Sequence, residues 1–189
     1  ARGLVTACVY PVTEGMEIQT NTEKVLKARK TTLELILSTH DKKCLSCIKN
    51  GECEFQKLCA DYGVEDEHRF DGQVITYDKD NSMPHLFRDN NKCVLCRRCI
   101  AVCEKNQAVA VIGANERGFK THIGCAFELT LDEVACVACG QCITVCPTGA
   151  LSEVDDTQKV WDALADKSKH VIVHTAPSIR ATLGECFGM

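Results

Sequence analysis

Apolar residues recur at helical spacing between Thr20 and His40. They share one face of a helix, and Asn21 or Thr22 stands where an N-cap residue accepts a hydrogen bond from the first helical turn. We therefore expect a helix here, with His40 at its C-terminal end. The apolar positions of this face are Val25, Leu26, Ala28, Leu33, Ile36 and Leu37.

The C-terminal part of the chain predicts a helix, a strand and a second helix. Residues 155–166 place Val160, Trp161 and Leu164 on one helical face, which is expected to pack on a neighbouring core. Residues 171–173 form an apolar run typical of a buried strand, followed by a turn at Pro177 and the start of a helix.

The middle of the chain contains a candidate pair of short strands. Residues 108–113 and 119–127 alternate well enough between apolar and polar positions to predict two strands. The sequence Asn-Glu-Arg-Gly at 115–118 predicts the turn between them.

Composition restricts the class of protein. The chain has 189 residues, 45% of them hydrophobic, and a net charge of -4, which is ordinary for one or two globular domains. Acidic residues outnumber basic ones, 26 to 22, which disfavours nucleic acid as a partner. The first residues have no signal-peptide pattern, and no apolar run reaches membrane-spanning length. We expect a reducing, cytoplasmic location.

The 15 cysteines change this picture, because eight of them form two copies of one spacing. The runs starting at Cys93 and Cys136 both read C-x2-C-x2-C-x3-C, and Pro147 follows the second. This spacing is typical of bacterial ferredoxins that hold two [4Fe-4S] clusters. Zinc sites and disulfides are the alternatives, but zinc sites favour two separate cysteine pairs.

The resemblance to two-cluster ferredoxins implies crossed ligands, because the fourth cysteine of each run binds the other cluster. One cluster is then expected to take Cys93, Cys96, Cys99 and Cys146. The second is expected to take Cys103, Cys136, Cys139 and Cys142. Gly140 and Gly149 suit a backbone that approaches the inorganic sulfur closely.

A further ligand set lies upstream. His40, Cys44, Cys47 and Cys53 read H-x3-C-x2-C-x5-C, which is a complete set of four. Spacing alone leaves a [4Fe-4S] cluster and a Cys3His zinc site equally open. A histidine at a helix C-terminus also has the simpler role of favouring the negative end of the helix dipole.

Cys8 lies in a segment, residues 4–22, that resembles the end of a plant-type ferredoxin domain, where the last of four cysteines binds a [2Fe-2S] cluster. The other three such cysteines are not in this chain, so we expect it to be a fragment of a longer protein. A lone buried cysteine is the alternative for Cys8. No metal role is expected for Cys59, Cys125 and Cys186.

The order of these motifs resembles the N-terminal region of [FeFe]-hydrogenases, of the large iron-sulfur subunit of NADH:quinone oxidoreductase and of NAD-linked formate dehydrogenases. In that group the histidine is a cluster ligand, which implies a [4Fe-4S] cluster at His40. Residues 169–189 are similar to the opening of the [FeFe]-hydrogenase catalytic domain, which favours the multimeric NAD(P)-dependent hydrogenases.

The resemblance implies an α+β fold class, with small iron-sulfur domains in series. The expected domains are the end of a [2Fe-2S] domain (1–19), a His/Cys3 domain (20–75), a two-[4Fe-4S] ferredoxin-like domain (76–155), and a linker helix with the start of the catalytic domain (156–189). The expected function is electron transfer to or from a hydrogen-converting H-cluster whose ligands lie outside this chain. Expected partners are flavin-containing NAD(P) dehydrogenase subunits and a small [2Fe-2S] subunit, with ferredoxin as a further candidate.

Overall fold

A computed structural model describes residues 3–188. The chain divides after Val154 into two compact units, each of which is described by itself. The first unit contains all the cysteine motifs named above. The second contains two helices and their connecting segment.

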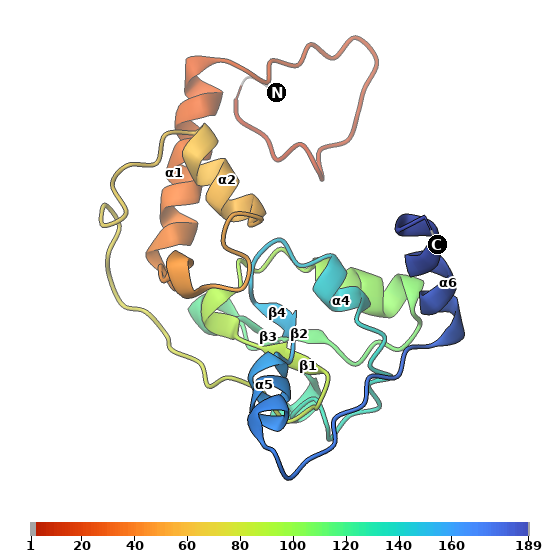
Figure 1. Cartoon of the computed structure of the whole chain (residues 1–189). Helices are drawn as coiled ribbons and strands as arrows, with labels where there is room; N and C mark the ends of the chain where they lie inside the picture. The colour runs from red at the N-terminus through yellow and green to blue at the C-terminus, as the bar shows by residue number, and fades with distance from the viewer. Residues whose placement is uncertain (1–2, 189) are drawn as a thin grey trace. The chain divides into compact units, whose positions relative to one another are not determined.

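Two helices dominate the part of the first unit that carries His40. Helix α1 (Glu23–Ser38) begins at Thr22, whose Oγ1 accepts a hydrogen bond from the backbone N–H of Val25 at 3.4 Å, as the sequence predicts. The helix ends two residues before His40, and its neighbour α2 (Glu54–Asp61) lies alongside it (Figure 1). Between them the chain makes the short 3-10 turn η1 (Cys44–Ser46). The cysteines thus lie on a compact loop that joins two packed helices.

The remainder of the first unit is built from very short elements. Strands β1 (Leu86–Arg88) and β4 (Leu151–Glu153) form one antiparallel pair, and β2 (Gly113–Asn115) and β3 (His122–Gly124) form another. Helices α3 (Arg98–Ala101) and α4 (Gln141–Thr144) occupy matching places in the two cysteine runs. The other short turns are η2 (Asn90–Lys92), η3 (Val102–Asn106, a π-helix), η4 (Gly118–Lys120) and η5 (Ala126–Glu128).

The core of this region is small and rich in sulfur. Its buried members are Leu86, Cys99, Cys103, Ile112, Ile123, Cys125, Leu131, Cys142 and Leu151. Four of these nine are cysteines, and three of the four belong to the expected ligand sets. Few large apolar side chains are therefore available to hold the strands and helices together.

The expected strand at 108–113 is wrong over most of its length. Only Gly113 enters strand β2, because Ala108 and Ala110 have left-handed backbone conformations with φ of 55° and 54°. The N–H groups of Val109 and Ala110 instead donate to the carbonyl oxygen of Cys103. Left-handed residues break the pleat that a strand requires, so pairing with β3 begins only at Gly113.

The second unit contains helices α5 (Thr157–Ala165) and α6 (Pro177–Cys186). Both helices agree with the sequence, but Pro177 is the first residue of α6 and not part of a separate turn, a position that proline favours. The expected strand at 171–173 is not formed, since no strand within residues 3–188 pairs with it. None of the described helices is both long and apolar enough to span a membrane.

Candidate iron-sulfur sites

One cavity of the first unit is lined by the first expected quartet. Cys93, Cys96, Cys99 and Cys146 all border it, together with Pro147. Cys146 follows α4 in the second run, but its side chain shares this cavity with the three cysteines of the first run. The structure therefore brings together the four cysteines that the crossed arrangement requires.

A second cavity is lined by the other expected quartet. Cys103, Cys136, Cys139 and Cys142 border it, and Val102 and Ile143 add apolar surface. Cys103 belongs to the π-helical turn η3, which continues directly from α3. Among residues 3–188, no three metal-ligating side chains lie close enough together to hold a single ion. The two cysteine quartets are therefore identified by the cavities that they line.

The backbone of the two cysteine runs repeats one unusual conformation. Leu95 and Arg97 in the first run have φ of 55° and 61°, and Ala138 and Gly140 at the equivalent positions have φ of 52° and 70°. Left-handed backbone costs a non-glycine residue about 1–2 kcal/mol. In the first run this turn lets the N–H of Leu95 donate to the Cys93 sulfur at 3.4 Å. Such N–H···S bonds stabilise a metal-bound thiolate.

Burial strongly affects the acidity of these cysteines. It raises the pKa of Cys99 to about 12 and that of Cys93 and Cys142 to about 11, and neighbouring cysteines contribute to each shift. Thiolates are the form that binds iron, so these side chains deprotonate only when cationic metal compensates the lost proton. The donor set therefore fits an iron-sulfur cluster bound within each cavity.

The third set lies around the loop between α1 and α2. Burial raises the pKa of Cys44, and the charges of Cys47 and Cys53 add to this shift. Cys53 is the N-cap of α2, and its sulfur accepts a hydrogen bond from the N–H of Gln56 at 3.5 Å. Cys59, for which no role is expected, also lies near Cys44 and Cys53.

His40 lies between the end of α1 and the loop that carries these cysteines. Its ring packs edge-on against Phe55 with centroids 5.1 Å apart, and its Nδ1 is buried without a hydrogen-bond partner. Burial lowers the pKa of His40, with smaller effects from Asp41, Lys92 and Asp89. A neutral imidazole suits metal binding, and the described residues form no hydrogen bond with either ring nitrogen, so this donor set also fits a cluster.

The third set lies against the segment that follows Cys146, a cysteine of the first quartet. A Cβ atom added at Gly149 would lie 2.7 Å from the Cys47 sulfur. The N–H of Glu54 donates to the Pro147 carbonyl at 3.1 Å, and the Arg98 guanidinium binds both Glu54 carboxylate oxygens at 2.8 and 2.9 Å. Gly149 therefore lies against a sulfur of the His40 set.

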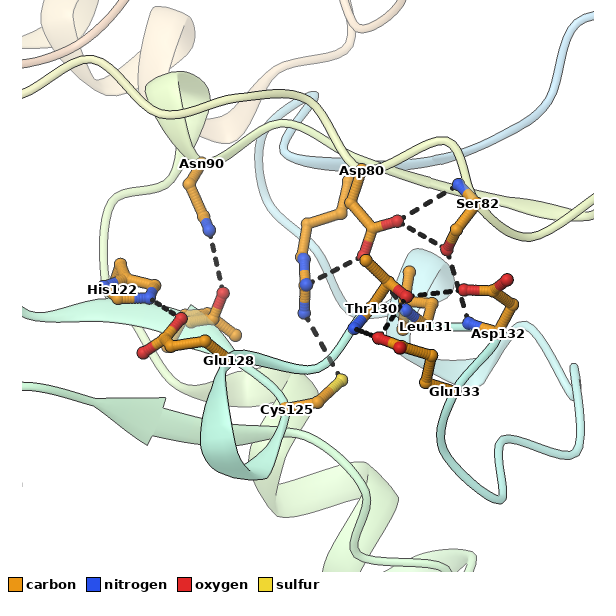
Figure 2. Close-up of polar contacts among 12 residues, drawn as sticks. Asp80, Ser82, Asn90, His122, Cys125, Glu128, Thr130, Leu131, Asp132 and Glu133 are labelled. Atoms are coloured by element: carbon orange, nitrogen blue, oxygen red, sulfur yellow. Dashed lines mark hydrogen bonds and ion pairs between the residues drawn. The ribbon is translucent and has the colours of Figure 1, made fainter.

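A polar network that the cysteine spacing did not indicate lies beside the quartets. The Arg88 guanidinium donates to Asp80 at 2.8 Å and to the sulfur of the fully buried Cys125 at 3.6 Å. Figure 2 shows that Asp80 also accepts from Ser82 and from the N–H of Leu131. These contacts join segments 37 and 51 residues apart, and no local pattern predicts them. Cys8 and Cys186 are exposed within their own units.

Family models and relatives agree on the two kinds of motif. Residues 29–68 match the iron-sulfur binding region of NADH-ubiquinone oxidoreductase-G, and residues 92–150 match a 4Fe-4S dicluster domain. The chain is 45% identical over its full length to the NADP-reducing hydrogenase subunit HndD of Solidesulfovibrio fructosivorans, and 41% identical over 99% of its length to iron hydrogenase 1 of Clostridium pasteurianum.

The chain matches the N-terminal iron-sulfur region of the iron hydrogenases. It spans about a third of these two relatives, 32% and 33% of their lengths. The chain also resembles a crystal structure of an NAD+-reducing [NiFe]-hydrogenase, with a TM-score of 0.72, 26% identity, and coverage of 79% of this chain and 63% of that one. An NADH-quinone oxidoreductase subunit from Rhizobium meliloti is 32% identical over 65% of the chain and 14% of its own length.

Proposed function

We propose that this chain is the electron-transfer relay of an iron hydrogenase. It carries electrons between a hydrogen-converting cluster, held by residues outside this chain, and NAD(P)-linked flavin subunits or ferredoxin. The observation that carries this proposal is the grouping of eight cysteines as two crossed quartets on two cavities, with Cys47 of the His40 set beside Gly149, in the segment that follows Cys146. Neighbouring one-electron centres are what an electron relay requires.

Three [4Fe-4S] clusters are assigned on this basis. One is held by His40, Cys44, Cys47 and Cys53, one by the Cys93, Cys96, Cys99 and Cys146 quartet, and one by the Cys103, Cys136, Cys139 and Cys142 quartet. When bound, these clusters supply reversible one-electron storage. The protein holds the sulfur ligands, excludes water around Cys99 and Cys142, and donates the Leu95 N–H to the Cys93 sulfur.

The full-length protein is proposed to hold two further centres. Cys8 would be one ligand of a [2Fe-2S] cluster in a domain of which residues 1–19 are the end, and an H-cluster would lie in the domain that begins within 156–189. The His/Cys3 domain (20–75) and the two-cluster domain (76–155) connect them. We further propose that the protein works in the cytoplasm with flavin-containing NAD(P) dehydrogenase subunits and a small [2Fe-2S] subunit. The names of the NADP-reducing and NAD+-reducing relatives support the link to NAD(P).

The equivalent region of an NADH:quinone oxidoreductase is the second candidate. The match of residues 29–68 and the Rhizobium relative favour it, but that relative covers 65% of the chain, against 100% and 99% for the two hydrogenases. The hydrogenase assignment therefore accounts for more of the chain, including its last residues.

Infrared spectroscopy of the native full-length protein tests the function. Carbon monoxide and cyanide stretches of an organometallic iron site are expected, together with hydrogen oxidation. Their absence from a fully metallated sample would refute the hydrogenase assignment. Metal analysis tests the His40 set separately, since one zinc per chain with iron for only two [4Fe-4S] clusters in the region of residues 20–155 would refute the third cluster.

A further inference from the structure

Two buried side-chain atoms within residues 3–188 have no hydrogen-bond partner, His40 Nδ1 and Asp89 Oδ2. They come from different parts of the first unit. His40 follows α1, whereas Asp89 is the N-cap of η2, just before the first cysteine run. Buried polar groups in proteins are nearly always satisfied by protein or by ordered water, so each unpaired atom calls for an explanation.

The two atoms share one environment. The N–H of Asp41 donates to the Asn91 carbonyl at 2.9 Å, which holds the segment after α1 against η2. Asp89 also lies close enough for its charge to act on the His40 ring, as does Lys92. A carboxylate oxygen and a ring nitrogen that both lack hydrogen-bond partners therefore lie on two segments that this backbone hydrogen bond joins.

The other oxygen of Asp89 is already used. Its Oδ1 accepts from the N–H of Asn91 at 3.1 Å and from the Asn91 amide at 2.8 Å. Lys79 and Lys92 place their Nζ atoms 3.8 Å from Oδ2, which is too far for a hydrogen bond but close enough for ion pairs with the fully buried carboxylate. Asp89 thus offers one free acceptor inside the protein.

The two nitrogens of His40 differ in access. The described residues form no hydrogen bond with either, but only Nδ1 is enclosed, while Nε2 is not among the buried atoms. A cluster would reach the accessible nitrogen, which makes Nε2 the expected ligating atom and leaves the proton on Nδ1. Histidine ligands commonly donate this second N–H to a carboxylate, either directly or through water.

We propose that Asp89 is a positioning residue for the His40 ligand, and that its Oδ2 accepts the Nδ1–H of His40 through one ordered water. This inference rests on the proposed function, because it requires a cluster bound at His40. The carboxylate fixes the tautomer and the ring orientation. It also makes the imidazole a stronger electron donor, which stabilises the oxidised cluster and lowers its reduction potential. Asp89 therefore couples the ferredoxin-like part to the ligand of the neighbouring cluster.

The test compares Asp89→Asn with Asp41→Asn in the full-length protein carrying its clusters. Asp41 is the matched control: its carboxylate is next to His40 in sequence, and its charge has a larger effect on the ring than that of Asp89, but its Oδ1 accepts from the N–H of Lys43. Both substitutions remove one nearby negative charge. Only Asp89→Asn should weaken the hydrogen bond at Nδ1.

Two readouts are needed. Potentiometric titration followed by electron paramagnetic resonance should show a higher potential for the His40 cluster in both variants. Pulsed measurement of the remote ring nitrogen should show altered coupling in Asp89→Asn alone. Unchanged coupling in Asp89→Asn, or an equal change in Asp41→Asn, overturns the role of Asp89. An unaltered protein that shows no histidine nitrogen coupling at all would instead overturn the ligand assignment, and this inference with it.

A measurement without substitutions covers the case in which Asp89→Asn does not fold. A crystal structure of the cluster-loaded full-length protein, at a resolution that reveals ordered water, should show one water within hydrogen-bond distance of both Nδ1 and Oδ2. A Nδ1–H that donates instead to a backbone carbonyl, or an apolar contact in this place, refutes the proposal.

Discussion

Replacing Arg88 with methionine should make local unfolding at the centre of the ferredoxin-like part more frequent. The Arg88 and Asp80 side chains are each only 10% exposed, and their charged atoms lie 2.8 Å apart. Methionine keeps much of the volume of arginine but leaves the Asp80 carboxylate buried without its cation. It also removes the hydrogen bond to the Cys125 sulfur.

The size of the effect follows from this burial. Breaking a buried ion pair from one side costs about 3–5 kcal/mol. Asp80 keeps its hydrogen bonds from Ser82 and Leu131, which places the cost at the lower end, about 3 kcal/mol. A loss of about 3 kcal/mol corresponds to an opening equilibrium increased on the order of 100-fold.

Hydrogen exchange measures this opening directly. The backbone N–H of Asp80 donates to the Arg88 carbonyl, and the N–H of Arg88 donates to the Asp80 carbonyl, both at 2.9 Å. The exchange rate of the peptide spanning residues 80–88 therefore reports on this bridge. Arg98→Met is the matched control, because Arg98 binds Glu54 with two hydrogen bonds but both side chains are about half exposed. Exposed pairs contribute about 0–1 kcal/mol. Acceleration below tenfold in Arg88→Met, or equal to that in Arg98→Met at residues 80–88, would refute this reasoning.

Three further predictions concern the close approach, one histidine and the metal. Gly149→Ala puts a methyl group 2.7 Å from the Cys47 sulfur and should cost about 1–3 kcal/mol and lower the iron content of the purified protein, whereas Gly113→Ala, which meets open space, should change neither. Burial acts to lower the pKa of His122, but hydrogen bonds to the Lys120 carbonyl and the Glu128 carboxylate outweigh it and raise the pKa above 6.5. The resulting stabilisation is fully present below pH 6.5 and lost as pH rises through the raised pKa. The unfolding temperature should therefore fall as the pH rises above 6.5, and His122→Gln should remove this fall. Removing iron with a chelator should abolish much of the far-ultraviolet circular dichroism, and an unchanged spectrum after complete iron loss would contradict a structural role of the clusters.

The helix α1 and the cysteine grouping could be predicted because their determinants are local. The apolar face and the Thr22 cap lie within one stretch of chain, and the structure confirms both. The crossed quartets follow from a spacing that occurs twice, and the two cavities agree with it, although binding of the clusters remains a prediction.

Other features depend on partners that are distant in sequence. The run at 171–173 has strand composition but finds no partner strand within residues 3–188. The alternation at 108–113 predicted a strand, but two left-handed alanines interrupt it. Asp89 gave no sequence signal at all, since its importance depends on where the chain places His40, 49 positions earlier. The residues around Asp89 or around His40 do not indicate that the fold brings these two segments together.

The two cysteine runs also explain why folding and metal binding should be one event. Each run holds left-handed backbone at the same two positions, and Leu95, Arg97 and Ala138 lack the freedom of glycine that would make this inexpensive. The core beside them contains few large apolar side chains, and its cysteines strongly prefer the neutral form when buried. Without metal, three factors therefore oppose this geometry: the left-handed backbone, the small apolar core and the cost of forming buried thiolates. Binding of iron would reverse the last of these, so we expect the two runs to keep this conformation only when the clusters are bound.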